Sequence, residues 1–99
     1  LEGRRIADLA DLYYIPIAPH NICGPVGTYA ACHLCAAIPN FLALEFHHLD
    51  STVWTGLVHG GDRLIEEGHI AVGDQPGLGL RLDEEAVGTH AVEDLGFLV

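Results

Sequence analysis

The chain has 99 residues and a formal net charge of −10, with 14 acidic side chains, four arginines and no lysine. This balance argues against a nucleic-acid partner, because phosphate neutralisation needs a basic stripe that the sequence lacks. No run approaches the roughly 18 apolar residues of a membrane-spanning helix, and the N-terminus lacks the apolar stretch of a signal peptide. We therefore expect a cytoplasmic protein with no membrane partner.

The composition is apolar for a free-standing domain, with 49% hydrophobic residues and a mean hydropathy of +0.29. Together with the absence of methionine, this leads us to expect a segment of a longer reading frame. The acidity fits either a solvated face or adaptation to high salt, in which an acidic surface keeps a protein in solution. Three cysteines cannot all pair, which favours a reduced compartment.

The first predicted elements are a helix and a strand. Apolar residues recur at helical spacing between Ile6 and Tyr13, so residues 4–13 are predicted to form an amphipathic helix with one face toward a core. The apolar run 14–18 then predicts a strand buried on both faces. Pro16 weakens this prediction because proline cannot donate to a β-ladder.

A second helix is predicted to begin at Gly24–Pro25 and to stop before Pro39–Asn40. The continuous apolar run 41–46 follows as a second strand. The order helix, strand, helix, strand over residues 1–50 indicates an α/β fold with parallel strands and a right-handed crossover.

Residues 51–99 are predicted to form a separate C-terminal segment. It contains a short helix or loop around Trp54, a hairpin that turns at Glu67–Gly68, and a turn-rich loop at 74–79. A brief helix is predicted to start at Asp83, with acidic residues at its positive end.

Two polar residues follow the predicted strands. His20 comes just after the first strand and Glu45 ends the second. Neighbouring strands lie about 4.8 Å apart, so both groups can face one small substrate. In a β/α barrel the catalytic groups lie at these strand ends. A lone histidine at such a position is often a loop residue whose hydrogen bonds are satisfied within the fold, and a lone glutamate is often exposed to solvent. A carboxylate in an apolar run, however, is costly to bury unless it is paired with another group or takes part in function.

Several sequence blocks occur in a characteristic order. They are Ile6–Ala10, Ala18-Pro19-His20-Asn21, Gly24-Pro25-Val26, His33, Pro39-Asn40-Phe41, Leu44-Glu45, Pro76-Gly77-Leu78-Gly79 and Asp83-Glu84. In this the chain resembles the mandelate racemase/muconate lactonizing enzyme subgroup of the enolase superfamily, and most closely its acid-sugar dehydratases of the galactonate and gluconate type. The resemblance covers essentially the whole chain but only about the last quarter of a family member.

The resemblance implies that the chain is the C-terminal fragment of a (β/α)-barrel, with its last two strand–helix units and a tail that packs on a capping domain. His20 then matches the histidine base at the end of the seventh strand, and imidazole suits this role because its pKa lies near neutrality. Glu45 matches the carboxyl group of the eighth strand, which stabilises the enediolate and would act while protonated in an apolar pocket. Asn21 and His47 are candidate substrate contacts.

The family's Mg²⁺ is held by three carboxylates on the third, fourth and fifth strands, and an acidic partner of the histidine lies on the sixth. This chain contains none of those segments, so we expect no metal ligand in it and no catalysis by it alone. The parent protein is expected to dehydrate a sugar acid to a 2-keto-3-deoxy acid and to form a homo-oligomer. The alternatives are racemisation or cycloisomerisation of a carboxylate, and a truncated product without activity.

Cys23 and the run Cys32-His33-Leu34-Cys35 raise a further alternative, a zinc site. In a helix Cys32 and Cys35 share a face while His33 points about 100° away, and no second cysteine pair completes a tetrahedral set. Buried thiols are therefore the favoured interpretation. His48 is a rim residue like His47, Trp54 is expected to be a packing anchor, and Gly77–Gly79 reads as a turn rather than a phosphate loop.

Overall fold

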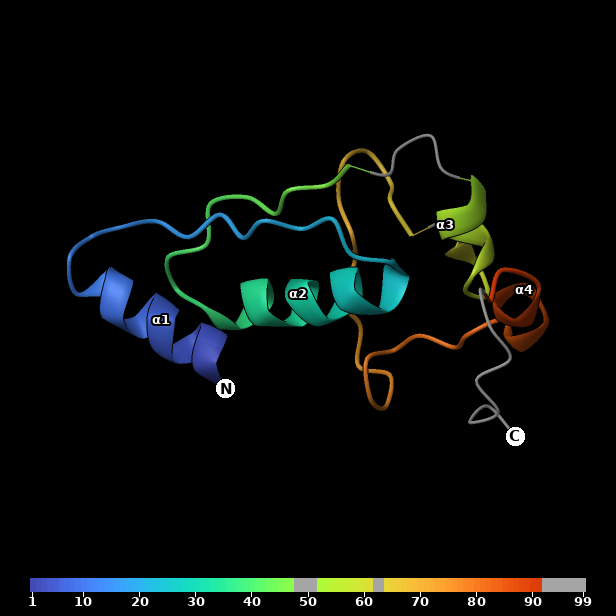
Figure 1. Cartoon of the computed structure of the whole chain (residues 1–99). Helices are drawn as coiled ribbons and strands as arrows, with labels where there is room; N and C mark the ends of the chain where they lie inside the picture. The colour runs from blue at the N-terminus through green and yellow to red at the C-terminus, as the bar shows by residue number, and fades with distance from the viewer. Residues whose placement is uncertain (48–51, 62–63, 92–99) are drawn as a thin grey trace.

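The computed structural model describes residues 1–47, 52–61 and 64–91. Within these residues the chain forms four helices (Figure 1): α1 at Glu2–Asp11, α2 at Pro25–Ala37, α3 at Thr52–Gly56 and α4 at Glu84–Thr89. Helices α1, α2 and α4 lie where the sequence predicts helices, and α3 lies where it predicts a short helix or a loop. None of them is both long enough and apolar enough to cross a membrane.

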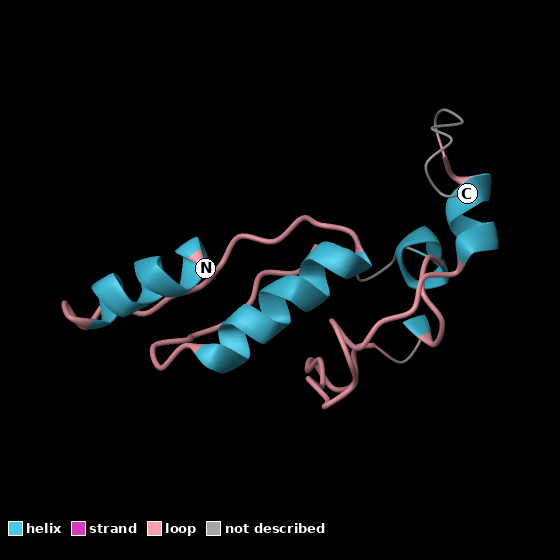
Figure 2. Ribbon diagram, turned by 90° about the horizontal axis from the view of Figure 1, so that it is seen from below, coloured by secondary structure: helices cyan, strands magenta, loops and turns pink. Residues whose placement is uncertain are grey.

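The two predicted strands, 14–18 and 41–46, are extended segments that run side by side along α2 (Figure 1), but the prediction of regular strands is wrong for the described residues. Their pairing is reduced to one parallel bridge between Ile17 and Phe41. The bridge uses the N–H of Ile17, which donates to the carbonyl of Asn40 at 2.8 Å, and the N–H of Leu42, which donates to Ile17 at 2.9 Å. Figure 2 accordingly draws these segments as loops.

Pro19 explains why the ladder stops. In a parallel ladder every second residue donates and accepts, so residue 19 should donate to residue 42, but proline has no N–H. The carbonyl of Pro19 instead accepts from the N–H of Glu45 at 3.2 Å. The segments therefore stay together past the bridge with a missing bond and a shift of one residue, since a regular ladder would use the N–H of Leu44. The chain around Glu45 thus lies next to Pro19.

Helix α1 packs on α2 through small residues. Ala7 is fully buried, and a Cβ added at Gly3 would lie 2.7 Å from Cδ2 of Leu34. Gly3 and Ala7 are four residues apart and so share one face of the helix. The prediction that the stripe with Ile6 and Leu9 faces the core is wrong for this structure, because these side chains are 63% and 60% exposed.

The segment that ends α2 ties the N-terminal half together. The amide Nδ2 of Asn40 donates to the carbonyls of Ala7 at 3.0 Å and Ile15 at 2.9 Å. Arg4 on α1 donates to the carbonyl of Ala37 at 2.6 Å. The residues that stop α2 thus fix both α1 and the segment that leads to His20.

The C-terminal segment is built from turns. The predicted hairpin is present as a short antiparallel bridge between Glu66 and His69. Its central residues, Glu67 and Gly68, have φ values of 49° and 78°, as primed hairpin turns require. Asp83 caps α4 by accepting a hydrogen bond from the N–H of Ala86 at 3.0 Å.

The described chain is extended for its length. Its radius of gyration is 15.2 Å, whereas a compact domain of 100 residues has about 13 Å. The buried apolar residues are Ala7, Tyr29, Cys32, Cys35, Ile38, Trp54 and Val58. This small core follows α2 and leaves large apolar side chains exposed elsewhere, as the apolar composition predicts.

Candidate active site

His20 and Glu45 meet at the end of the paired segments. The bridge at Ile17 and the bond from Glu45 to Pro19 hold the two segments together up to this point. Nδ1 of His20 forms a hydrogen bond with Oε2 of Glu45. An ionised carboxylate only accepts, so Nδ1 carries the proton and the lone pair of a neutral ring lies on Nε2. The His20 side chain is 70% exposed, which leaves Nε2 accessible.

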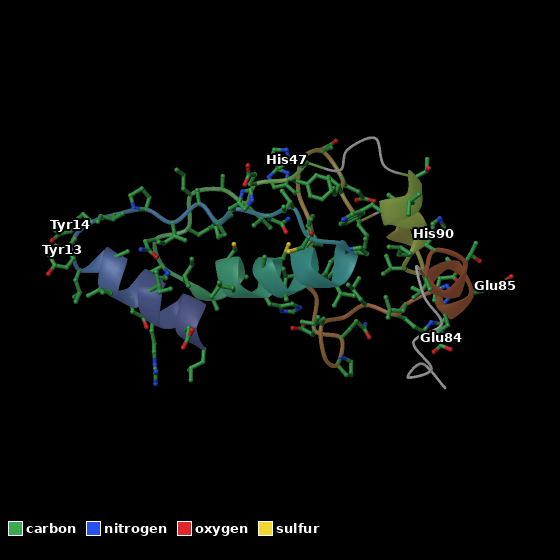
Figure 3. The ribbon with its side chains drawn as sticks, in the orientation of Figure 1. Tyr13, Tyr14, His47, Glu84, Glu85 and His90 are labelled. Atoms are coloured by element: carbon green, nitrogen blue, oxygen red, sulfur yellow. The ribbon has the colours of Figure 1, made fainter. Side chains whose placement is uncertain are left out.

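His47 lies on the other oxygen of the same carboxylate. Its Nε2 is 2.6 Å from Oε1 of Glu45. Figure 3 shows His47 at the end of the second extended segment, on the side away from α2. The Glu45 carboxylate therefore contacts two imidazoles. His20 follows the first extended segment, and His47 follows the second. The third predicted rim histidine, His48, lies outside the described residues.

The pKa of Glu45 is lowered from its ordinary value of 4.5. The hydrogen bond from His47 is the largest cause, and partial burial opposes it. The N–H of Asn21, 3.2 Å from Oε2, and the contact with His20 lower the pKa further. The raised pKa expected from the resemblance is not observed in this chain, because the side chain is 39% exposed and hydrogen-bonded rather than enclosed in an apolar pocket. At neutral pH Glu45 is an acceptor.

Asn21 faces the interior. Its side chain is 1% exposed, with Nδ2 donating to Oγ1 of Thr28 at 3.1 Å and Oδ1 accepting from the N–H of Cys23 at 3.3 Å. Only the backbone N–H of Asn21 points at Glu45. This arrangement favours a positioning role over the substrate contact predicted from sequence.

Thr28 is a residue that the sequence analysis missed. It is fully buried in the first turns of α2, and it links that helix to the loop after His20 through Asn21. A threonine in the first helical turns, seven residues after an asparagine in a loop, was the available signal.

Trp54 also supports the loop that follows His20. It is 4% exposed, and its Nε1 donates to the carbonyl of Cys23 at 3.1 Å. Its ring contacts Phe46 edge-on, with centroids 5.1 Å apart. Trp54 is thus the packing anchor that the sequence predicts.

The described residues contain no group of three histidine, cysteine, aspartate or glutamate side chains that could hold a metal ion. Cys32 and Cys35 are buried and free, and burial raises the pKa of both thiols. His33 is turned away and donates from Nε2 to the carbonyl of Leu78 at 3.0 Å. The cluster of His20, Glu45 and His47, called the Glu45 cluster below, does not fit Mg²⁺ either. That ion prefers oxygen ligands, and here imidazoles occupy both carboxylate oxygens.

Comparison with known proteins identifies the family. Residues 1–86 match the family described as Enolase C-terminal domain-like. The chain belongs to this family. Its fold is that of a portion of the (β/α)-barrel domain of enolase-like proteins, which accounts for the parallel pairing at Ile17 and Phe41.

Relatives of this enolase-like chain are named acid-sugar dehydratases. It is 53% identical over 92 residues to the D-xylonate dehydratase of Haloferax volcanii, covering 93% of this chain and 22% of the relative. It is 37% identical over 92 residues to a D-galactonate dehydratase family member of Chromohalobacter salexigens, covering 91% and 22%. The chain thus spans about a fifth of the length of these curated relatives.

A solved structure agrees with this assignment. It is a mandelate racemase/muconate lactonizing enzyme-like protein from Rubrobacter xylanophilus, with a TM-score of 0.86 and 54% sequence identity. The match covers 93% of this chain and 24% of that one. The sequence-based resemblance to the enolase superfamily is therefore confirmed.

Proposed function

We propose that this chain carries the His20 and Glu45 part of the active site of an acid-sugar dehydratase. The observation that supports this best is the hydrogen bond between the two side chains at the end of a parallel pair of segments. The names of the relatives point to the same chemistry, because they include a D-xylonate dehydratase, a D-mannonate dehydratase and a D-gluconate/D-galactonate dehydratase. In the whole enzyme, segments 14–18 and 41–46 would be the seventh and eighth barrel strands, with the tail on the capping region.

In this proposal His20 is the base. Nε2 takes the proton from the carbon next to the substrate carboxylate, and Glu45 lies beside the ring, hydrogen-bonded to Nδ1. The electron pair left on that carbon then expels the hydroxyl of carbon 3, which leaves as water after gaining a proton. The resulting enol becomes a 2-keto-3-deoxy acid.

Enzymes of the enolase superfamily generally use Mg²⁺, which stabilises the negative charge that develops on the substrate carboxylate. The described residues do not fit such a site, and in this proposal its ligands come from the upstream barrel strands of the whole enzyme. The 99 residues alone would then be inactive. We also propose a cytoplasmic location, a homo-oligomeric parent and, from the charge of −10, a protein adapted to high salt.

A chimera tests the proposal. The chain replaces the 92 matching residues of the Haloferax volcanii D-xylonate dehydratase, and formation of 2-keto-3-deoxy acid is followed with Mg²⁺ and D-xylonate. We expect an active chimera that loses about 100-fold or more of its rate in the His20→Asn variant, since a positioned general base contributes about 10²–10⁴-fold. His59→Asn, at an exposed position in the tail, serves as the control. A folded chimera without activity would contradict the proposal.

The second candidate is racemisation or cycloisomerisation, favoured by the name of the solved structural relative. Racemisation, like dehydration, begins with removal of the proton next to the carboxylate. The chimera incubated in D₂O separates them, because a dehydratase forms the keto acid while a racemase exchanges the α-proton and returns the epimer. Exchange without loss of water would favour the second candidate.

A further inference from the structure

The backbone around Glu45 alternates in a way that turns His47 to the same side. In an extended segment residues i and i+2 point to one side and residue i+1 points to the other. Phe46 packs against the buried Trp54 ring, with centroids 5.1 Å apart, which fixes the direction of the alternation. Glu45 and His47 therefore lie together on the opposite side, where Nε2 of His47 is 2.6 Å from Oε1 of Glu45.

This contact leaves one nitrogen of His47 open to a ligand. The pKa of Glu45 is lowered, and an ionised carboxylate only accepts hydrogen bonds, so Nε2 of His47 carries the proton. In a neutral ring the lone pair then lies on Nδ1. Among the described residues, the hydrogen bond to Glu45 is the one that the His47 ring makes. The side chain is 55% exposed, which leaves Nδ1 accessible as an acceptor.

The rings of His47 and His20 lie within reach of one small molecule. Their centroids are 6.4 Å apart, with the ring planes at 60° to each other. The two side chains are 55% and 70% exposed, so neither ring is covered by the described residues. A substrate of several carbons that meets Nε2 of His20 with one carbon can therefore reach His47 with a group further along its chain.

From this geometry we infer that His47 binds the substrate through Nδ1, which accepts a hydrogen bond from a hydroxyl group beyond carbon 3. The inference rests on the proposed function, because it needs a substrate carbon placed at His20. It does not use the contact between His20 and Glu45. It deepens the proposed function by naming the substrate class, an acid whose carbon chain carries hydroxyl groups beyond the one that is lost.

The chemistry of the acceptor decides what His47 selects. A lone pair binds a hydroxyl donor, whereas a carboxylate or carbonyl oxygen has no proton to offer it. A site that hydrogen-bonds a substrate hydroxyl discriminates against an analogue without it, because the polar group of the site is then left unpaired. An exposed ion pair with no ligand would behave differently, since its loss has little effect and would not depend on which acid is bound.

The first experiment compares substrates in the chimera described above. D-xylonate is compared with its 4-deoxy and 5-deoxy analogues. We expect kcat/KM for D-xylonate to exceed that for at least one analogue by about 10-fold. His47→Phe, which keeps a ring but has no acceptor, should remove this preference, mainly through a raised KM for D-xylonate. His47→Gln, whose amide keeps an acceptor and a donor, should restore part of it. His59→Phe is the matched control and should keep the preference.

The second experiment measures binding without turnover. In the His20→Asn chimera the dissociation constant of D-xylonate is measured by calorimetry with Mg²⁺ present. Adding His47→Phe should raise this constant about 10-fold, the loss expected for one hydrogen bond whose partner stays unpaired. The constant for the discriminated deoxy analogue should not change, and adding His59→Phe should change neither.

The third experiment uses the 99-residue chain itself. The ring nitrogens of His47 are observed by NMR at a pH where the ring is neutral. We expect the proton on Nε2 and the lone pair on Nδ1. A neutral ring with its proton on Nδ1 would overturn the inference, because that nitrogen could not accept from a hydroxyl group.

The two proposals fail in different ways. An inactive chimera whose binding of D-xylonate still depends on His47 contradicts the dehydratase proposal but supports the role of His47. An active chimera in which His47→Phe lowers kcat/KM equally for all three acids, or for none, overturns the role of His47 and leaves the dehydratase proposal standing. Equal dissociation constants with and without His47→Phe overturn that role whatever the activity.

Discussion

His33 on α2 donates from Nε2 to the carbonyl oxygen of Leu78 at 3.0 Å, across 45 positions of the sequence. The bond attaches the turn at Pro76–Gly79 to the helix that follows His20. It also gives His33 a structural use in place of the metal-binding alternative. The C-terminal segment is thus tied directly to the element that carries the active-site loop.

Replacing His33 by phenylalanine should release this turn. The variant keeps a ring of similar size but loses the donor, and a hydrogen bond of this kind contributes about 0.5–1.5 kcal/mol. We expect faster amide hydrogen exchange at Gly79, whose N–H donates to the carbonyl of Pro76 at 3.3 Å. His59→Phe should leave this exchange rate unchanged. Equal rates in the two variants would show that the bond does not hold the turn.

The Glu45 cluster predicts a stability loss in acid. Because the pKa of Glu45 is lowered in the folded chain, its contribution to stability is complete above the ordinary value of 4.5 and is lost as the pH falls through the lowered pKa. Denaturant unfolding between pH 3 and pH 7 should show this decline in the parent chain. In the Glu45→Gln variant the free energy of unfolding should fall less over the same pH range. If the free energies of unfolding of the parent chain and the variant declined in parallel with pH, the prediction would be contradicted.

Thr28→Val tests the buried pair behind the site. Valine keeps the shape of threonine but leaves the buried Nδ2 of Asn21 without the acceptor it has at 3.1 Å. An unsatisfied buried group costs about 1–3 kcal/mol, measured as a lower free energy of unfolding in urea. Thr89→Val, an exposed threonine bonded to Glu85 within α4, should change stability by less than about 0.5 kcal/mol. Similar effects of the two substitutions on stability would show that Thr28 does not support the site.

Gly61 should not tolerate a side chain. An added Cβ would lie 1.8 Å from the carbonyl oxygen of Thr55, so the backbone would have to move. We expect Gly61→Ala to lower the free energy of unfolding by about 1–3 kcal/mol or more, the usual cost of overpacking. Gly56→Ala, with nothing within 4 Å of its Cβ, should be neutral or slightly stabilising. Thermal unfolding of both variants measures the difference.

The three thiols should differ in reactivity. Cys23 is exposed, while Cys32 and Cys35 are buried with pKa values raised by that burial. A neutral thiol reagent at pH 7 should therefore label one cysteine quickly and the other two only after denaturation, since the thiolate is the reactive form. Cys23→Ser should abolish the fast phase. Fast labelling of that variant would contradict the burial of Cys32 and Cys35.

The sequence alone was sufficient to predict the helices and the proximity of His20 and Glu45. Pro25 opens α2 and Pro39–Asn40 ends it through local backbone effects that no distant contact has to supply. The order helix, strand, helix, strand requires two parallel segments, and polar residues at their ends then meet. His20 and Glu45 could therefore be predicted as neighbours from chain order, and their hydrogen bond agrees with this.

Tertiary structure decided the rest, because periodicity shows which residues share a face but not which face a neighbour approaches. Small residues let α1 approach α2 on the side of Gly3 and Ala7, which left Ile6 and Leu9 exposed. The charge state of Glu45 depended on partners that the fold brings to it, His20 on one oxygen and His47 on the other. A carboxylate is ionised or neutral according to its burial and its hydrogen bonds. The burial and the hydrogen bonds of Glu45 are set only in the folded chain, where His20 lies beside a residue 25 positions away in the sequence.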